Sequence, residues 1–129
     1  MSYSQTDKDV REAASVMDLI IEIRENLRME IRPNSKGSEY LEAVIWKSNL
    51  ESLQSLIAKH LGPALKGSGS EANFSVEVQK LVDSMGGLRI EQSFFCRQEG
   101  NNIFYATLWP WESNPERITL KAGEYLLNH

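Results

Sequence analysis

Cysteine and histidine are scarce in this chain of 129 residues, which contains one cysteine and two histidines. Because Cys96 is the single thiol, the chain cannot close a disulfide within itself or build a zinc site from thiolates. His60 and His129 lie far apart in the sequence, and neither has acidic neighbours at the spacing of metal ligands. The sequence therefore predicts no bound metal and no other cofactor.

Long apolar runs and an excess of positive charge are missing as well. No segment approaches the roughly 18 to 20 consecutive apolar residues of a membrane span, and residues 1–9 lack the apolar run of a signal peptide. We therefore expect a cytoplasmic protein with no membrane partner. Its 18 acidic and 14 basic residues give a net charge of −4, which argues against general binding to nucleic acid.

The length and composition of the chain are those of an ordinary soluble domain, with 41% hydrophobic and 25% charged residues. At this length a chain can bury a proper core without disulfides or metals. We expect one domain over residues 1–129, with residues 1–6 frayed.

The first predicted helix begins at a cap formed by Thr6 or Asp7 and continues to about Ile31, where Pro33 and the following polar loop end it. Its apolar residues recur at helical spacing and cover a wide face, which predicts packing against more than one neighbour.

Three arginines follow one another at the end of this predicted helix. Arg24 and Arg28 continue one apolar row, and Arg32 lies beside them. The simpler interpretation is that the row turns into solvent there. The alternative is a contact with an acidic partner or a phosphate, although neighbouring glutamates dilute the positive field.

A second helix is predicted from Ser38 to about Leu61, where Gly62 and Pro63 stop it. Its apolar residues form two displaced rows, one over residues 41–45 and one over residues 46–61. Either the helix bends or breaks at residues 47–49, or its two halves contact different neighbours. We favour the second interpretation, in which the first half reaches toward the sheet or a second subunit.

Residues 62–73 have the glycine and serine content of a flexible linker. A third, shorter helix is expected to begin at Asn73 or Ser75 and to end at Gly86 and Gly87, because Val78, Leu81, Val82 and Met85 form one apolar stripe.

The region from residue 88 to residue 127 predicts a meander of three antiparallel strands. Side chains alternate from Leu88 onward, a glycine and asparagine turn follows Glu99, and Pro110 ends the second strand. Gly123 suggests a bulge in the third strand. The fold class is therefore α+β, with a helical hairpin and a third short helix packed on this sheet.

The predicted sheet is apolar on both of its faces. With Phe94, Phe104 and their row on the inner face, the outer face still carries four aromatic residues: Phe95, Tyr105, Trp109 and Trp111. Each of these rings hides on the order of 150 Å² or more. Helices or a loop of the same chain could cover them, a protein partner or second copy could do so, or they could line a small-molecule pocket.

The candidates for catalysis are few. Cys96 shares a strand face with Phe94, where free cysteines are usually inert core residues. His60 lies near the end of the predicted second helix, where an imidazole can contact the last carbonyl groups. A pair of Cys96 and His60 as nucleophile and base has no flanking motif to support it, so the sequence favours a non-enzymatic protein without excluding an enzyme.

These features lead to two hypotheses. The first is a cytoplasmic interaction module, homodimeric, that uses the outer face formed by Phe95, Tyr105, Trp109 and Trp111. The second is a small-ligand binding or sensor domain with a pocket between helices and sheet, in which Arg24 or Arg28 holds an anionic end.

Overall fold

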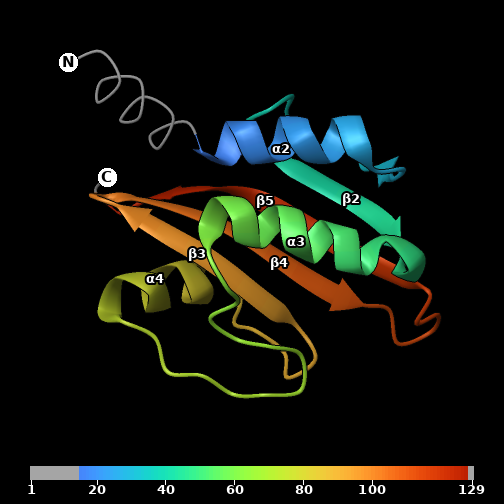
Figure 1. The fold of residues 1–129 in the computed structure, drawn as a ribbon. Helices are drawn as coiled ribbons and strands as arrows, with labels where there is room; N and C mark the ends of the chain where they lie inside the picture. Colours follow the sequence, from blue (N-terminus) through green and yellow to red (C-terminus); the bar gives the residue numbers. More distant parts are fainter. Residues whose placement is uncertain (1–14, 128–129) are drawn as a thin grey trace, which may run out of the picture.

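A five-stranded antiparallel sheet runs through the computed structural model, which describes residues 15–127 (Figure 1). The helices are α2 (Ser15–Asn26), α3 (Leu50–Leu61) and α4 (Val76–Ser84), and the short 3-10 helix η1 (Lys47–Asn49) precedes α3. The strands are β1 (Glu30–Ile31), β2 (Leu41–Trp46), β3 (Ser93–Glu99), β4 (Asn102–Pro110) and β5 (Arg117–Leu126). Their order across the sheet is β1-β2-β5-β4-β3. The predicted α+β class is confirmed, with five strands in place of three.

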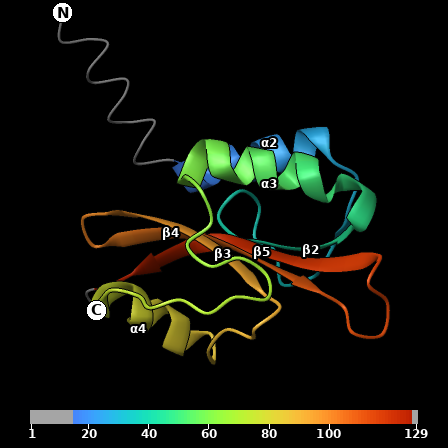
Figure 2. The same ribbon diagram turned by 60° about the horizontal axis from the view of Figure 1, so that its bottom comes forward.

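The sheet lies between two helical layers. Figure 2 shows α2 and α3 together on one face, called the helix-pair face here, and α4 alone on the opposite face, called the α4 face. Side chains alternate between these faces along every strand. Leu41, Ala43 and Ile45 of β2 are fully buried against the helix pair. The other face has its own core, in which α4 packs on Phe94 and Ile103.

The helix-pair face carries the larger core. Its strand members on β3, β4 and β5 are Phe95, Phe104, Ala106, Leu108, Ile118, Leu120 and Ala122. The helices complete it with Leu19, Ile20 and Ile23 of α2 and Leu53, Ile57 and Leu61 of α3. All of these side chains are at most 4% exposed. Burying each of the larger side chains, the leucines, isoleucines and phenylalanines, contributes about 1.5 to 3 kcal/mol, which makes this layer the main source of stability.

The first predicted helix is wrong at its C-terminal end. Helix α2 stops at Asn26, and Glu30 and Ile31 form strand β1 on the edge of the sheet. Arg32 continues this contact, because its backbone N–H donates to the carbonyl of Glu42 at 2.8 Å. Pairing with β2 therefore overrides a helical pattern that had no strong stop signal at Asn26. The predicted start at Thr6 or Asp7 and the frayed residues 1–6 lie outside the described residues.

The second predicted helix is also wrong in its first half. Residues 41–46 form β2, which pairs with β5 along its whole length, from Leu41 opposite Ala122 to Trp46 opposite Arg117. Helix α3 begins only at Leu50, after η1. The chain therefore breaks at residues 47–49, which is the first of the two interpretations of this segment. The displaced apolar rows of this segment thus arise from a strand followed by a helix.

The C-terminal meander is confirmed, although its boundaries and one detail differ. Strand β3 begins at Ser93, because residues 88–92 form a turn in which Gln92 N–H donates to the carbonyl of Arg89 at 3.0 Å. Strand β4 does end at Pro110. The predicted bulge at Gly123 is absent, since the register between β4 and β5 continues unbroken from Asn102 opposite Leu126 to Pro110 opposite Ile118.

Residues 62–73, expected to be a free linker, lie along the outer edge of β3. Lys66 forms a bridge with Phe94, whose N–H donates to the Lys66 carbonyl at 2.9 Å. The Lys66 side chain is only 5% exposed, and its ammonium donates to the carbonyls of Gly67, Ile90 and Gln92 at 3.2, 2.8 and 2.6 Å. Burial lowers the pKa of Lys66. All three donors are satisfied, so this lysine fastens the segment to the turn before β3.

None of the helices within residues 15–127 is long and apolar enough to cross a membrane.

Candidate functional site

Part of the α4 face is not covered by any helix of the described chain (Figure 2). Helix α4 packs on the part of the sheet that holds Phe94 and Ile103, and the part built from β2, the start of β5 and the end of β4 extends beyond it (Figure 2). All three tryptophans of the chain lie on this open part. Trp46 is 37% exposed, and Trp109 and Trp111 are half-buried.

Strand register brings two of these tryptophans onto one arginine. Trp46 is directly opposite Arg117 on one side. On the other side, the backbone N–H of Trp111 donates to the Arg117 carbonyl at 2.9 Å. The Arg117 guanidinium lies 5.1 Å from the centre of the Trp46 ring and 6.0 Å from that of Trp111. The Trp111 indole also donates to the Thr119 hydroxyl at 2.8 Å. These contacts hold both rings in place at the surface.

A second arginine stacks on the third tryptophan. The Arg89 guanidinium, from the turn before β3, lies 4.6 Å from the centre of the Trp109 ring. We call these five residues the tryptophan surface: Trp46, Arg89, Trp109, Trp111 and Arg117. Beside it lies a hollow of about 660 Å³ whose lining includes one cation, Arg89, and two carboxylates, Glu91 and Glu112.

The four aromatic residues predicted to share one face do not do so. Phe95 is 4% exposed and packs in the core beneath α2 and α3, opposite Ala106. Tyr105 is on the α4 face, half-buried beside the core under α4. The face assignment of Phe95 was wrong because two adjacent phenylalanines are buried on opposite sides of β3, and alternation alone does not show which of them meets the helix pair.

A groove of about 560 Å³ continues from the tryptophan surface toward α4. The sheet provides its floor, with Thr107 and Lys121 opposite each other on β4 and β5. The end of α4 and the turn that follows provide its wall. The lining residues are Tyr40, Ser84, Met85, Gly86, Gly87, Leu88, Arg89, Gln92, Tyr105, Thr107, Trp109, Thr119 and Lys121.

Two tyrosines of the groove lining, Tyr40 and Tyr105, pack against Gly123. A Cβ atom added at Gly123 would lie 2.9 Å from Cδ1 of Tyr40 and 3.1 Å from the hydroxyl of Tyr105. The Tyr40 hydroxyl donates to Oε1 of Glu42 at 3.1 Å. Burial, followed by the nearby Glu42 carboxylate, raises the pKa of Tyr40, and burial raises the pKa of Tyr105. Both phenols therefore remain protonated donors at neutral pH.

The three arginines predicted as an anion site do not form a row. Arg24 is on α2, Arg28 follows the end of that helix, and Arg32 follows β1. Arg24 donates to the Gly37 carbonyl at 3.3 Å, and Arg32 pairs with Glu30 at 3.3 Å. All three are exposed. The predicted spacing required a helix through residue 32, and that helix ends at Asn26.

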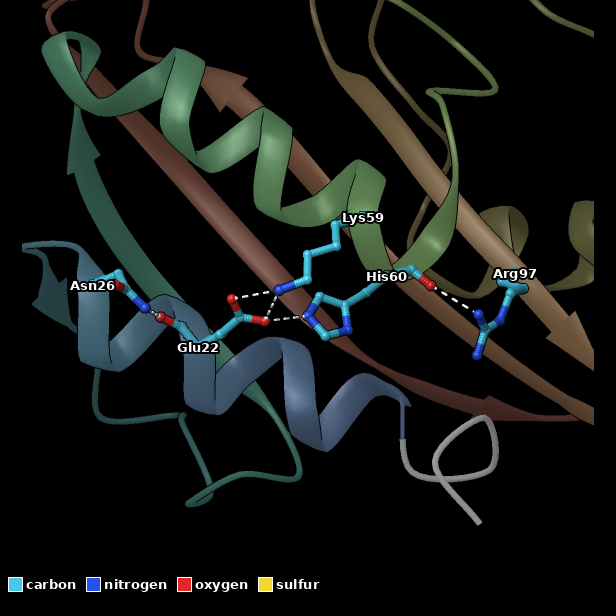
Figure 3. A network of polar contacts seen from close by, with 5 residues as sticks. All are labelled: Glu22, Asn26, Lys59, His60 and Arg97. Carbon is cyan, nitrogen blue, oxygen red and sulfur yellow. Dashed lines mark hydrogen bonds and ion pairs between the residues drawn. The ribbon is translucent and has the colours of Figure 1, made fainter. Parts of the chain in front are cut away.

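His60 connects the two helices of the helix-pair face (Figure 3). Its Nε2 lies 2.6 Å from Oε1 of Glu22 on α2, and the Lys59 ammonium donates to both oxygens of that carboxylate, at 3.1 and 2.9 Å. The hydrogen bonds from His60 and Lys59 lower the pKa of Glu22. The predicted contact of this imidazole with helix-end carbonyls is replaced by an ion-pair network, whereas the His60 carbonyl accepts from Nη1 of Arg97 at 3.0 Å.

Cys96 is remote from this histidine, because it lies on the α4 face beside Tyr105 and Leu88. The sheet separates its thiol from His60, so the two cannot act as nucleophile and base. Burial raises the pKa of Cys96 to about 11, which keeps it in the unreactive thiol form at neutral pH.

Four residues of the groove and the tryptophan surface are not predicted as site residues from local sequence: Tyr40, Trp46, Arg89 and Lys121. The local pattern predicts a helix at Trp46 and a strand at Arg89, and both predictions are wrong. The pattern does contain a signal for Lys121. Ile118 and Leu120 lie on the core face of the predicted third strand, so Lys121 lies on the opposite face. Tyr40 gave no such signal, since only the pairing of β2 with β5 brings it near Gly123.

No protein-family model, no curated protein and no solved structure matches this chain. Within residues 15–127, the histidine, cysteine and acidic side chains form no group of three or more that could hold a metal ion.

Proposed function

We propose that this protein is a non-enzymatic interaction module and that the tryptophan surface is its contact site, with a second copy of the chain as partner. The observation that carries the proposal is the position of all three tryptophans and two stacked arginines on a part of the sheet that no helix within residues 15–127 covers. Tryptophan, tyrosine and arginine are the residues that most often contribute binding energy at protein interfaces.

The local order of this surface supports the proposal. The guanidinium of Arg117 and the hydroxyl of Thr119 fix the Trp111 ring, and the guanidinium of Arg89 fixes the Trp109 ring. Rings held in this way lose little side-chain entropy when a partner binds, which lowers the cost of association.

The charges favour a second copy over a strongly acidic or basic partner. The hollow beside the tryptophan surface contains Arg89 together with Glu91 and Glu112. In a two-fold symmetric dimer the same patch meets itself, so a cation of one copy can pair with a carboxylate of the other. A patch of one sign would repel itself.

Sedimentation velocity over a range of micromolar concentrations tests this proposal. The wild-type protein is expected to dimerise, and the double variant Trp46→Thr, Trp111→Thr to remain a folded monomer, because both rings are partly exposed and lie at or beyond the end of a strand. Val76→Thr is the matched control, since Val76 is 72% exposed and lies on α4, away from the tryptophan surface.

Charge reversal at Arg89 and Glu112 provides a second test of the dimer. Arg89→Glu alone is expected to weaken the dimer, and adding Glu112→Arg in the same chain is expected to restore it, because the two-fold axis repeats the exchange in both copies. A wild-type protein that remains monomeric throughout, or a dimer that the tryptophan variant leaves unchanged, contradicts the proposal.

A further inference from the structure

We infer that the groove between α4 and the sheet binds a small organic anion, with its charged group at Lys121 and a planar body against Trp109. This groove shares Arg89 and Trp109 with the tryptophan surface, whereas Lys121, Thr107 and the end of α4 belong to the groove alone.

The charge of the groove is opposite to that of the chain. Its lining contains two cations, Arg89 and Lys121, and no aspartate or glutamate. The whole protein has a net charge of −4. Acidic residues outnumber basic ones in the chain, so a concave site whose charged lining residues are both cations is a local exception, and it attracts anions.

Lys121 is the central residue of this site. It is half-buried on β5, and its ammonium has no hydrogen-bond or ion-pair partner within residues 15–127. Glu42 lies directly opposite on β2 but does not line the groove, and its carboxylate accepts from Tyr40. A partly desolvated ammonium without a fixed partner gains more from a bound anion than an exposed lysine does.

Hydroxyl groups around Lys121 can complete the binding of an anionic group. Thr107 is opposite Lys121 on β4, and Tyr105 is next on the same face; neither hydroxyl makes a hydrogen bond to another side chain or to the backbone within residues 15–127. Thr119 accepts from the Trp111 indole, so its own proton remains available. A carboxylate or phosphate has several acceptor positions and suits such a set of donors.

The volume of the groove and its apolar lining residues indicate the size and shape of the uncharged part of the ligand. A volume of about 560 Å³ falls within the roughly 300 to 1,000 Å³ of small-molecule sites. Met85 and Leu88 on the wall and Trp109 on the floor offer apolar contact to a flat ring, and Arg89 stacks over Trp109 at the border. The ligand class is therefore an aromatic compound of mononucleotide size or smaller that carries one phosphate or carboxylate.

Isothermal titration calorimetry with two matched pairs of compounds tests this inference. The pairs are adenosine monophosphate with adenosine, and naphthoate with naphthalenemethanol. At least one anion is expected to bind at micromolar to millimolar concentration, at least about tenfold more tightly than its neutral counterpart. Whichever anion binds more tightly identifies phosphate or carboxylate as the preferred group.

Variants assign the binding to the groove. Lys121→Met is expected to weaken binding at least about tenfold, Lys121→Arg to preserve it, and Lys80→Met, on the exposed side of α4, to leave it unchanged. Glu42→Gln is expected to strengthen it, because it removes the nearest negative charge. The inference is overturned if neither anion binds, if neutral compounds bind equally well, or if folded Lys121→Met retains full affinity.

Discussion

The imidazole Nε2 of His60 on α3 lies 2.6 Å from Oε1 of Glu22 on α2, and this contact links the two helices that cover the main core. Because a carboxylate only accepts, the imidazole N–H is the donor. The side chains of His60 and Glu22 are 15% and 29% exposed, so water screens this pair less than it screens the outer partner Lys59, which is 62% exposed.

Glu22→Gln is expected to lower the free energy of unfolding at neutral pH by about 1 kcal/mol, because the amide loses the charge that accepts from His60 and Lys59. Urea unfolding measures the change. Glu25→Gln, an exposed substitution on the same helix, is the control and is expected to alter stability by less than about 0.5 kcal/mol.

The same pair predicts a pH dependence. The pKa of Glu22 is lowered from its ordinary value of 4.5 in the folded protein, so its contribution to stability is complete above that pH and is lost as the pH falls further, through the folded value. The difference in stability between the wild type and Glu22→Gln should therefore shrink below pH 4.5. A difference that stays constant down to the acid transition would show that the charge of Glu22 contributes nothing.

Lys66→Met should destabilise the fold by about 1 to 3 kcal/mol, because the carbonyls of Ile90 and Gln92 lose a buried donor while the aliphatic part of the side chain is retained. Limited proteolysis should at the same time cut residues 62–73 faster than in the wild type. Lys80→Met, with an exposed ammonium, is the control. Equal cleavage rates for Lys66→Met and the wild type would mean that the ammonium does not fasten this segment.

Gly123→Ala is expected to cost about 1 to 3 kcal/mol, since the new methyl group would lie 2.9 Å from the Tyr40 ring. Gly67→Ala is the matched control, because its Cβ would meet only the Ser70 hydroxyl at an ordinary 3.7 Å. Thermal unfolding compares the two. If Gly123→Ala costs less in a Tyr40→Ala background than in the wild type, the collision with the Tyr40 ring is the cause.

Cys96 should react slowly with iodoacetamide in the native protein and rapidly in urea, because its thiol is half-buried and its pKa is raised to about 11. Mass spectrometry of the labelled protein measures both rates. Rapid native labelling at neutral pH would indicate an activated thiolate and would reopen the question of catalysis at this residue.

The sequence predicted the elements whose patterns fit a single period. Leu53, Ile57 and Leu61 of α3 and Val78, Leu81 and Val82 of α4 form the predicted apolar stripes, and both sets are buried. The meander of β3, β4 and β5 was also predicted, since its turns and Pro110 separate the strands clearly.

Strand β2 was missed because its residues satisfy two periods at once. Leu41, Val44 and Ile45 have the spacing of a helix, whereas Leu41, Ala43 and Ile45 have that of a strand, and all four are buried. Only the pairing of β2 with β5 decides between the two patterns. The groove depends on the same pairing, because Tyr40 and Lys121 lie far apart in the sequence and only the pairing of β2 with β5 brings them together. Local pattern could therefore place neither the strand nor the site.

The two borders of the sheet limit how copies of this chain can aggregate. On one side β1 offers only two residues, and on the other the amide and carbonyl of Phe94 are already used by Leu65 and Lys66. Amyloid-like growth requires a long, flat border of free amides to template the next chain. Here one border is short and the other is already paired at its start, so this protein can carry exposed indoles on a sheet and still resist polymerising strand by strand.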